Sequence, residues 1–357
     1  MMTMARVFKK SSRNGQLVLF LGKRDFVDHI ERVDPIEGVL VIDQSELQGR
    51  KVWIQLMTAF RYGNEDLDVI GLTFRKDIWV HHIELFPPAG HDPELSPMHE
   101  ALMKKAGEQG CPFTIDIPTN LPCSVSLHPG EEEKTKACGV DFEIKAYMAM
   151  EADNPDEVID KKDCCRLMIR KIQYAPDQTS PGPKQSFMKC FITSDKPVHL
   201  EISLDKEVHY HGEAIPIKVK VRNETSKVIN KVKIAVDQTT DVVLYSADKY
   251  TKNVLNQEFP ETVEAGATFE KSLCVTPLLA THMDKKGLAL DGKLKDEDTN
   301  LASSTLIRPG MERDLVGILV SYKIKVTLIS GGGGFLGGLT ASEITGELPL
   351  VLMHPQP

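Results

Sequence analysis

The sequence lacks the features of a membrane-spanning or secreted protein. A helix that crosses a bilayer needs about 18 or more consecutive apolar residues, and no stretch of this chain is that long. The N-terminus, MMTMARVFKK, has no apolar segment of the kind found in signal peptides. Both absences predict a cytoplasmic protein.

Motifs that carry enzymatic chemistry are also missing. The sequence has no GxSxG, HExxH, P-loop or EF-hand pattern, and its seven cysteines show no CxxC spacing. An odd number of cysteines in a cytosolic protein favours reduced, mostly buried thiols over a disulfide framework. We therefore expect no enzyme, no cofactor and no bound metal.

Charge and size restrict the class further. The net charge of −8 argues against broad nucleic-acid binding, which needs a basic surface. It leaves room for a local basic patch that binds a phosphorylated partner. With 357 residues, 41% of them hydrophobic, the chain is long enough for two globular domains at roughly 100–200 residues each.

Alternation of apolar and polar residues dominates the chain and predicts half-buried β-strands. The clearest runs are 215–222 and 318–328, and shorter ones lie at 52–56 and 232–236. Many strands separated by turn residues are typical of β-sandwiches or barrels. One short helix is expected at about 97–108, where Ser96 can cap the first turn and Pro97 suits the first helical position. The segment Ala175–Lys184, rich in proline and polar residues, is the best domain boundary.

Two patterns resemble ligand sites without completing one. Residues 332–337 match GxGxxG, but no helix opens at the glycines and no acidic residue follows at the spacing of a dinucleotide site. The segment is either a flexible hairpin loop or a loop that presents apolar side chains to a membrane. His209 and His211 alternate along one strand and would share a face, but no third metal ligand is evident.

The charged residues carry more information. Lysines and arginines at the first strands and on the helix, if clustered, would bind an anion. For any single lysine, a solvated surface is the simpler interpretation. Arg170 is unusual because it ends the apolar run Leu167–Arg170, so it can be partly buried and would then need carboxylate partners.

Several long stretches of the sequence match a known family. They are Val7–Lys10, Leu21–His29, Phe60–Gly63, Asp68–Asp77, Asn120–Ser124, Gly287–Lys295 and Glu297–Ser304. Through them the sequence resembles the arrestin family, over essentially the whole chain from residue 6 to Pro355. The finer pattern at 237–252 is most similar to the cone-photoreceptor subtype.

The resemblance implies an all-β fold of two seven-stranded antiparallel sandwiches with one short α-helix on the first. It places an N-domain at 1–175, a hinge at 176–185 and a C-domain at 186–357. It also implies a buried polar core between the domains that senses receptor phosphate, in which Arg170 is surrounded by Asp25, Asp291 and Asp298. Arrestins are not enzymes, which agrees with the missing motifs.

The same resemblance gives roles to basic residues and loops. Receptor phosphate would be bound by Lys9, Lys10, Arg24, Lys105, Lys293 and Lys295. The loop 62–71 resembles the finger loop that enters an active receptor, with contacts from Tyr62, Glu65, Asp66, Leu67, Asp68, Val69 and Ile70. Residues 331–339 resemble an edge loop that touches lipid, which favours the membrane interpretation of Phe335, Leu336 and Leu339.

The implied partner is an activated, phosphorylated G-protein-coupled receptor, with a cone opsin as the first choice. Contact with membrane lipid, weak self-association and a photoreceptor cell are further expectations. The printed sequence ends at Pro357, before the acidic C-terminal tail usual in arrestins, so endocytic adaptors cannot be inferred. The competing hypothesis is a trafficking scaffold of the arrestin-like class that does not sense phosphate.

Overall fold

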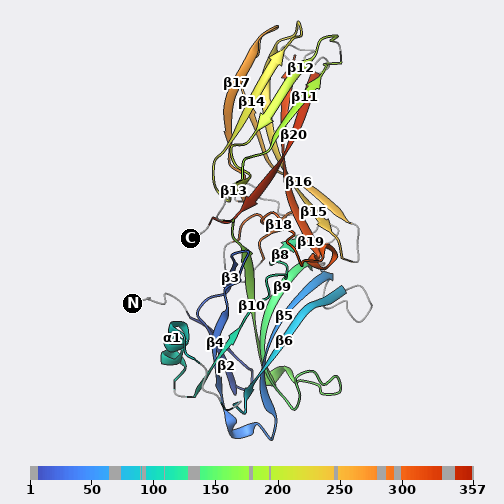
Figure 1. Cartoon of the computed structure of the whole chain (residues 1–357). Helices are drawn as coiled ribbons and strands as arrows, with labels where there is room; N and C mark the ends of the chain where they lie inside the picture. Colours follow the sequence, from blue (N-terminus) through green and yellow to red (C-terminus); the bar gives the residue numbers. More distant parts are fainter. Residues whose placement is uncertain are drawn as a thin grey trace.

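The chain folds into two β-sandwiches placed end to end in an elongated molecule (Figure 1). The computed structural model describes residues 7–63, 74–88, 90, 94–107, 109–127, 137–176, 180–192, 194–244, 248–279, 287–292, 299–331 and 342–355. The predicted class, two β-sandwiches with one α-helix, is confirmed for this part of the chain.

The N-terminal sandwich contains two sheets. The strands of the first, in spatial order, are β1 (Phe8–Ser11), β2 (Leu17–Leu21), β4 (Ile36–Ile42) and β7 (Gly110–Ile115). The second has the order β18 (Ala289–Leu290), β8 (Val125–Leu127), β9 (Ala137–Ala149), β10 (Cys164–Gln173) and β3 (Asp25–Asp28). A hairpin of β5 (Lys51–Gly63) and β6 (Phe74–Phe86) also pairs with β9.

The C-terminal sandwich contains the other two sheets. One has the order β11 (Lys184–Lys189), β12 (Val198–Ser203), β14 (Ile215–Asn223) and β17 (Thr268–Val275). The other has the order β13 (Val208–Tyr210), β20 (Ser342–Met353), β19 (Ile318–Ser330), β15 (Ile229–Val242) and β16 (Lys249–Phe259). Short edge strands such as β3 and β13 bring the described strands of each sandwich above seven, and these two pair in parallel rather than antiparallel.

The predicted alternation explains why these strands form. On β14 the side chains of Ile215, Ile217 and Val219 are fully buried, whereas Lys218 and Lys220 between them face solvent. Burying one such aliphatic side chain stabilises the fold by about 1.5–3 kcal/mol. The alternation on β19, Ile318–Ser330, follows the same rule.

The predicted helix is α1 (Pro97–Ala106), which covers the outer face of the first sheet (Figure 1). Ser96 caps it: its hydroxyl accepts from the His99 backbone N–H at 3.2 Å. Gly107, at a φ of 86°, ends the helix by donating its N–H to the Met103 carbonyl at 2.8 Å. Leu102 is buried against Phe20 and Val39 of the sheet. Short 3-10 helices lie at Gln44–Glu46, Lys161–Asp163 and Arg313–Val316.

Two backbone contacts join the sandwiches. Strand β18, from the second half of the sequence, pairs with β8 of the N-terminal sandwich. After β10, Tyr174 forms an isolated parallel bridge with His354, and the Ala175 N–H donates to the His354 carbonyl at 2.9 Å. The end of the C-terminal sandwich is therefore held beside the end of β10.

All seven cysteines are described, and none is in a disulfide. The prediction that most of them are buried is wrong. Only Cys138 and Cys165 are buried, and Cys190 and Cys274 are exposed because they lie at or beside strands on the surface of the C-terminal sandwich.

Candidate functional site

Arg170 and Asp25 form a bidentate ion pair near the place where the two sandwiches meet. Arg170 on β10 and Asp25 on β3 are opposite each other in a parallel strand pair. The Arg170 Nε and Nη2 atoms each donate to one Asp25 carboxylate oxygen, both at 2.7 Å. Such bidentate, charge-assisted bonds are the strongest class of side-chain hydrogen bond.

The C-terminal half packs directly on this arginine. A Cβ atom added to Gly292 would lie 3.1 Å from Arg170 Cδ and 2.9 Å from Ser124 Cβ. Glycine lets the backbone at 292 approach closely, and its φ of +31° lies in a region that L-residues rarely adopt. The Arg170 side chain is therefore covered by the segment that follows β18.

Asp291 lies next to Gly292, but its carboxylate turns away from Arg170 into the C-terminal sandwich. Its Oδ1 accepts from the Ser303 backbone N–H at 2.8 Å, and its Oδ2 lies 2.5 Å from His354 Nε2. His211 Nε2 is 3.8 Å from the same oxygen. Among the described residues its ionic partners are these histidines, whereas Arg170 pairs with Asp25.

A second charged cluster joins the sandwiches, and the sequence did not reveal it. Asp28 is fully buried and pairs with Lys171 at 2.5 Å. Arg308 reaches Asp28 from the other sandwich, with Nη1 at 2.9 Å and Nη2 at 2.6 Å from its two carboxylate oxygens. Arg308 also donates to the carbonyls of Ile30 and Thr119, at 2.8 and 2.6 Å. One side chain of the C-terminal sandwich thus makes four hydrogen bonds to the N-terminal sandwich.

Strand geometry explains why there are two clusters. Successive side chains of a strand point to opposite faces. Arg170 and Lys171 therefore face opposite ways, as do Asp25 and Asp28, which are separated by an odd number of positions. In the parallel register Arg170 is paired with Asp25, while Lys171 reaches Asp28 on the interior side.

Burial and charge set the protonation of Asp28. Burial alone raises the pKa of its carboxyl group, but the hydrogen bonds and positive charges of Arg308 and Lys171 outweigh burial and lower the pKa below 3.8. Asp28 is therefore a carboxylate at neutral pH. Cys123, whose sulfur lies 3.5 Å from Lys171 Nζ, is a partly exposed residue, but desolvation of its thiol raises the pKa of that thiol.

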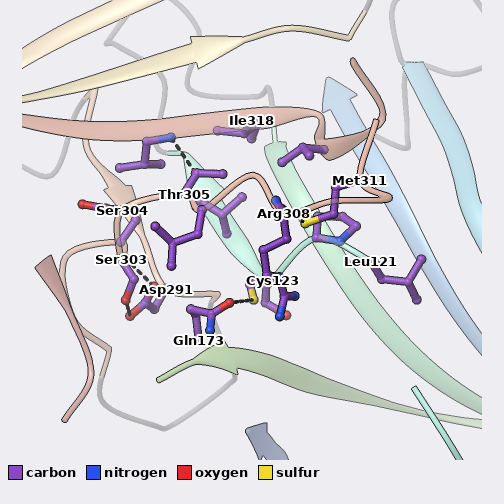
Figure 2. A pocket seen from close by; sticks show the side chains of 17 residues that line it. Leu121, Cys123, Gln173, Asp291, Ser303, Ser304, Thr305, Arg308, Met311 and Ile318 are labelled. Carbon is purple, nitrogen blue, oxygen red and sulfur yellow. Dashed lines mark hydrogen bonds between the residues drawn. The ribbon is translucent and has the colours of Figure 1, made fainter. Parts of the chain in front are cut away.

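A small cavity of about 40 Å³ lies between Arg308 and Asp291 (Figure 2). Arg308 and Cys123 line one side of it, and Asp291 and Ser303 line the other. A space of this size can hold a few water molecules. The cavity is not large enough for a metabolite. The contacts at the junction therefore serve to hold the two sandwiches together.

Four of the six predicted phosphate-binding residues are described. Lys9 and Lys10 are exposed on β1, and Lys105 is exposed in the last turn of α1. Lys9 Nζ lies 5.6 Å from the centroid of the Phe20 ring, whose other neighbours include α1. The first strand and the helix thus present positive charge on the same side of the sheet.

Arg24 connects this surface to Arg170. Its guanidinium carbon lies 5.6 Å from the centroid of the Phe8 ring on β1. Its Nε donates to the Met168 carbonyl at 2.8 Å, and its own carbonyl accepts from the Arg170 N–H at 2.8 Å. Lys9, Lys10 and Arg24 thus lie at or beside β1, and Arg24 is joined through its backbone to Arg170; these four residues are called the basic track.

Several predicted residues lie outside the described part of the chain. They are Lys293, Lys295, Asp298, the membrane-edge residues Phe335, Leu336 and Leu339, and the finger-loop residues Glu65, Asp66, Leu67, Asp68, Val69 and Ile70. Tyr62 is described, at the end of β5, and its hydroxyl contacts Asp248 of the C-terminal sandwich at 3.4 Å. No helix among the described residues is long and apolar enough to span a bilayer.

The structure places His209 and His211 in different surroundings. Strand β13 ends at Tyr210, so His209 is buried inside the sandwich while His211 begins a turn and faces Asp291. Burial lowers the pKa of His211 to about 4. The prediction that both imidazoles share a strand face is wrong, because the strand is one residue too short.

The fold and the site define a protein of two β-sandwiches joined by a buried ion pair. The family described as arrestin (or S-antigen), N-terminal domain, matches residues 17–175. The corresponding C-terminal domain family matches residues 194–357. The chain belongs to the arrestin family, so the family resemblance of the sequence is confirmed.

Similar curated proteins cover nearly the full chain. Arrestin-C of Homo sapiens is 54% identical over 356 residues, which are 99% of this chain and 91% of that protein. Arrestin-C of Mus musculus is 52% identical over 356 residues, or 99% and 93% of the two chains. Arrestin-C of Lithobates pipiens is 51% identical over 354 residues, or 99% and 90%. Arrestins bind activated G-protein-coupled receptors and desensitise them, and they are adaptors rather than enzymes.

Proposed function

We propose that this arrestin binds an activated receptor that also carries phosphate, with a cone opsin as its receptor. Binding ends signalling because the arrestin occupies the surface that the G protein uses. A receptor phosphate triggers tight binding by competing with Asp25 for Arg170. Loss of the whole polar-core network around Arg170, which the segment after β18 covers, then loosens the junction so that the two sandwiches can rotate.

The observation that carries this proposal is the asymmetric exposure of the ion pair. The Arg170 side chain is 9% exposed, whereas the Asp25 side chain is 40% exposed. An anion can therefore approach from the side of Asp25 and replace it. A receptor phosphate carries about −1.5 to −2 charges and offers three acceptor oxygens, so it outcompetes a single carboxylate for the guanidinium fork.

The basic track supports a route for the phosphate. Lys9 and Lys10 lie at the exposed end, Arg24 lies in the middle, and Arg170 lies at the buried end. Exposed positive charges raise the local concentration of an anionic segment before it reaches the buried arginine. Lys105 on α1, with Lys293 and Lys295, completes the proposed phosphate-binding set. Asp298 completes the proposed polar core, to which Asp291 contributes through its backbone beside Gly292 because its carboxylate faces His354.

The remaining assignments follow from the same function. Residues 62–71 insert into the cytoplasmic cavity of the active receptor, and residues 331–339 rest on the surrounding lipid. The segment 176–185 is the hinge between an N-domain, 1–175, and a C-domain, 186–357. The protein works in the cytoplasm of a photoreceptor cell and is recruited to the membrane that bears the receptor.

The test is binding of the chain to cone-pigment membranes in four states: dark or illuminated, each with and without phosphorylation. Co-sedimentation measures the bound fraction. Strong binding only to the illuminated and phosphorylated pigment supports the proposal. Equal binding to illuminated pigment with and without phosphate would contradict the phosphate trigger, and no binding to any of the four would contradict the opsin assignment.

A further inference from the structure

Two histidines and an aspartate from three distant parts of the chain converge at the junction of the sandwiches. His211 follows β13, Asp291 follows β18, and His354 follows β20. One ligand atom from each residue, an imidazole nitrogen or a carboxylate oxygen, lies within 4.8 Å of the other two. We propose that these three side chains form a binding site for a divalent transition-metal ion of the zinc class.

The geometry fits such an ion closely. Zinc binds imidazole nitrogen at about 2.0–2.1 Å and carboxylate oxygen at about 2.0–2.2 Å, so ligand atoms at tetrahedral angles lie about 3.3–3.5 Å apart. Here Asp291 Oδ2 is 2.5 Å from His354 Nε2 and 3.8 Å from His211 Nε2. Side-chain rotations that move the ligand atoms by about 1 Å or less would place them at three corners of a tetrahedron.

The backbone positions all three ligands in advance. The His211 N–H donates to the Met353 carbonyl at 3.1 Å, which ties it to the residue before His354. The His354 carbonyl accepts from Ala175 at 2.9 Å. The Asp291 N–H donates to the Asn300 carbonyl at 3.1 Å. A site built on strand ends and fixed loops pays little ordering entropy when the ion binds.

Ser303 contacts two of the three proposed metal ligands, His211 and Asp291. The Ser303 N–H holds Asp291 Oδ1 at 2.8 Å, which leaves Oδ2 to face the histidines. The Ser303 hydroxyl lies 3.0 Å from His211 Nε2 and 3.3 Å from Asp291 Oδ2. The Ser303 N–H is an outer partner of the kind that orients metal-ligating carboxylates in known sites, whereas its hydroxyl lies beside the two atoms that would bind the ion. Asp291 and Ser303 also line the cavity of Figure 2, which gives a fourth ligand such as water a place to bind.

Charge also favours a cation here. The Asp291 side chain is only 12% exposed, and within the described ranges no lysine or arginine forms an ion pair with it. A nearly buried carboxylate is costly unless a positive charge or strong hydrogen bonds offset it.

The donor set selects among metals. Two imidazoles and one carboxylate, with a fourth position open to water, are typical of zinc sites with three protein ligands. Magnesium and calcium prefer sites made entirely of oxygen ligands. The competing arrangement is a proton shared by His354 and Asp291, with no affinity for metal. A bound ion would hold the segment after β18 against the end of β20.

The test uses the metal-free full chain titrated with Co²⁺, whose visible absorption reports four-coordinate binding. We expect one Co²⁺ per chain, displaced by Zn²⁺. His211→Gln and His354→Gln each weaken binding at least about tenfold, a loss that even outer-shell changes can cause in metal sites. His199→Gln is the matched control, since this histidine of the same sandwich pairs with Glu224 at 3.3 Å, away from the cluster. It leaves binding unchanged.

Two further measurements keep the outcome decisive. Asp291→Asn preserves side-chain shape and also abolishes binding, while circular dichroism verifies that each variant is folded. X-ray absorption at the zinc edge shows only nitrogen and oxygen neighbours. Sulfur neighbours would place the ion on cysteine and overturn the proposal, as would Co²⁺ affinity that is absent in the wild type or unchanged in both histidine variants.

Discussion

Arg308 and Asp28, 280 residues apart in the sequence, form a bidentate ion pair that joins the two sandwiches. The aspartate is fully buried, and the arginine side chain is 13% exposed. Unlike Asp25, this carboxylate cannot be reached from solvent. The junction thus has one ion pair whose carboxylate is accessible to solvent, Arg170–Asp25, and one whose carboxylate is fully buried, Arg308–Asp28.

Removing the buried Arg308–Asp28 ion pair should weaken the contact between the sandwiches without unfolding the N-terminal sandwich. In Arg308→Met, Asp28 keeps Lys171 as its partner. We expect a loss of about 3 kcal/mol in unfolding free energy, the low end of the range for breaking a buried pair. Urea denaturation at pH 7 measures it. Arg313→Met, at the exposed start of the 3-10 helix that follows, should change stability by less than about 0.5 kcal/mol. Equal losses of unfolding free energy in the two variants would contradict a stabilising contact between Arg308 and Asp28.

The same contact gives a pH signature. The folded-state pKa of Asp28 is lowered below 3.8, so the stability it contributes is present above that value and is lost as the pH falls through the folded-state pKa. We therefore expect the stability difference between wild type and Arg308→Met to shrink as the pH falls below about 3.8. Urea denaturation between about pH 3 and 6 follows the difference. A difference that stays constant would show that Asp28 is not the linked group.

Gly292 should tolerate no side chain. In Gly292→Ala the new methyl group would press on Arg170 and Ser124, at 3.1 and 2.9 Å. Overpacking of this kind costs about 1–3 kcal/mol, in addition to backbone strain. Gly310→Ala is the matched control, because Gly310 also has a positive φ but no atom lies within 4 Å of the added Cβ. Thermal unfolding of both variants isolates the packing cost, and equal destabilisation would mean that the segment can move away.

Local patterns in the sequence predicted the secondary structure well. The alternation at 215–222 specified β14, and Ser96 with Pro97 specified the start of α1. Arg170 stood out because an arginine inside an apolar run has to find a carboxylate. These signals depend only on neighbours along the chain, which is why they could be read without a structure.

Contacts between distant segments could not be read in this way. The residues His211, Asp291 and His354 are separated by 80 and 63 positions, and strand order alone brings them together. Lys171 had one detectable signal. Adjacent residues of a strand face opposite sides, so either Arg170 or Lys171 had to point inward and needed a second aspartate. Asp28 supplies it, but only the parallel register of β3 and β10 identifies it.

The most direct test of the proposed function is charge reversal at Arg170. The bound fraction of Arg170→Glu is measured on illuminated cone-pigment membranes with and without phosphorylation. The matched control is Arg166→Glu, on the same strand, whose side chain is 55% exposed. In Arg170→Glu the carboxylates at 170 and 25 repel each other, so the switch is open and binding should no longer need phosphate. The control should keep the phosphate requirement of the wild type. If Arg170→Glu still binds only phosphorylated pigment, Arg170 is not the phosphate sensor.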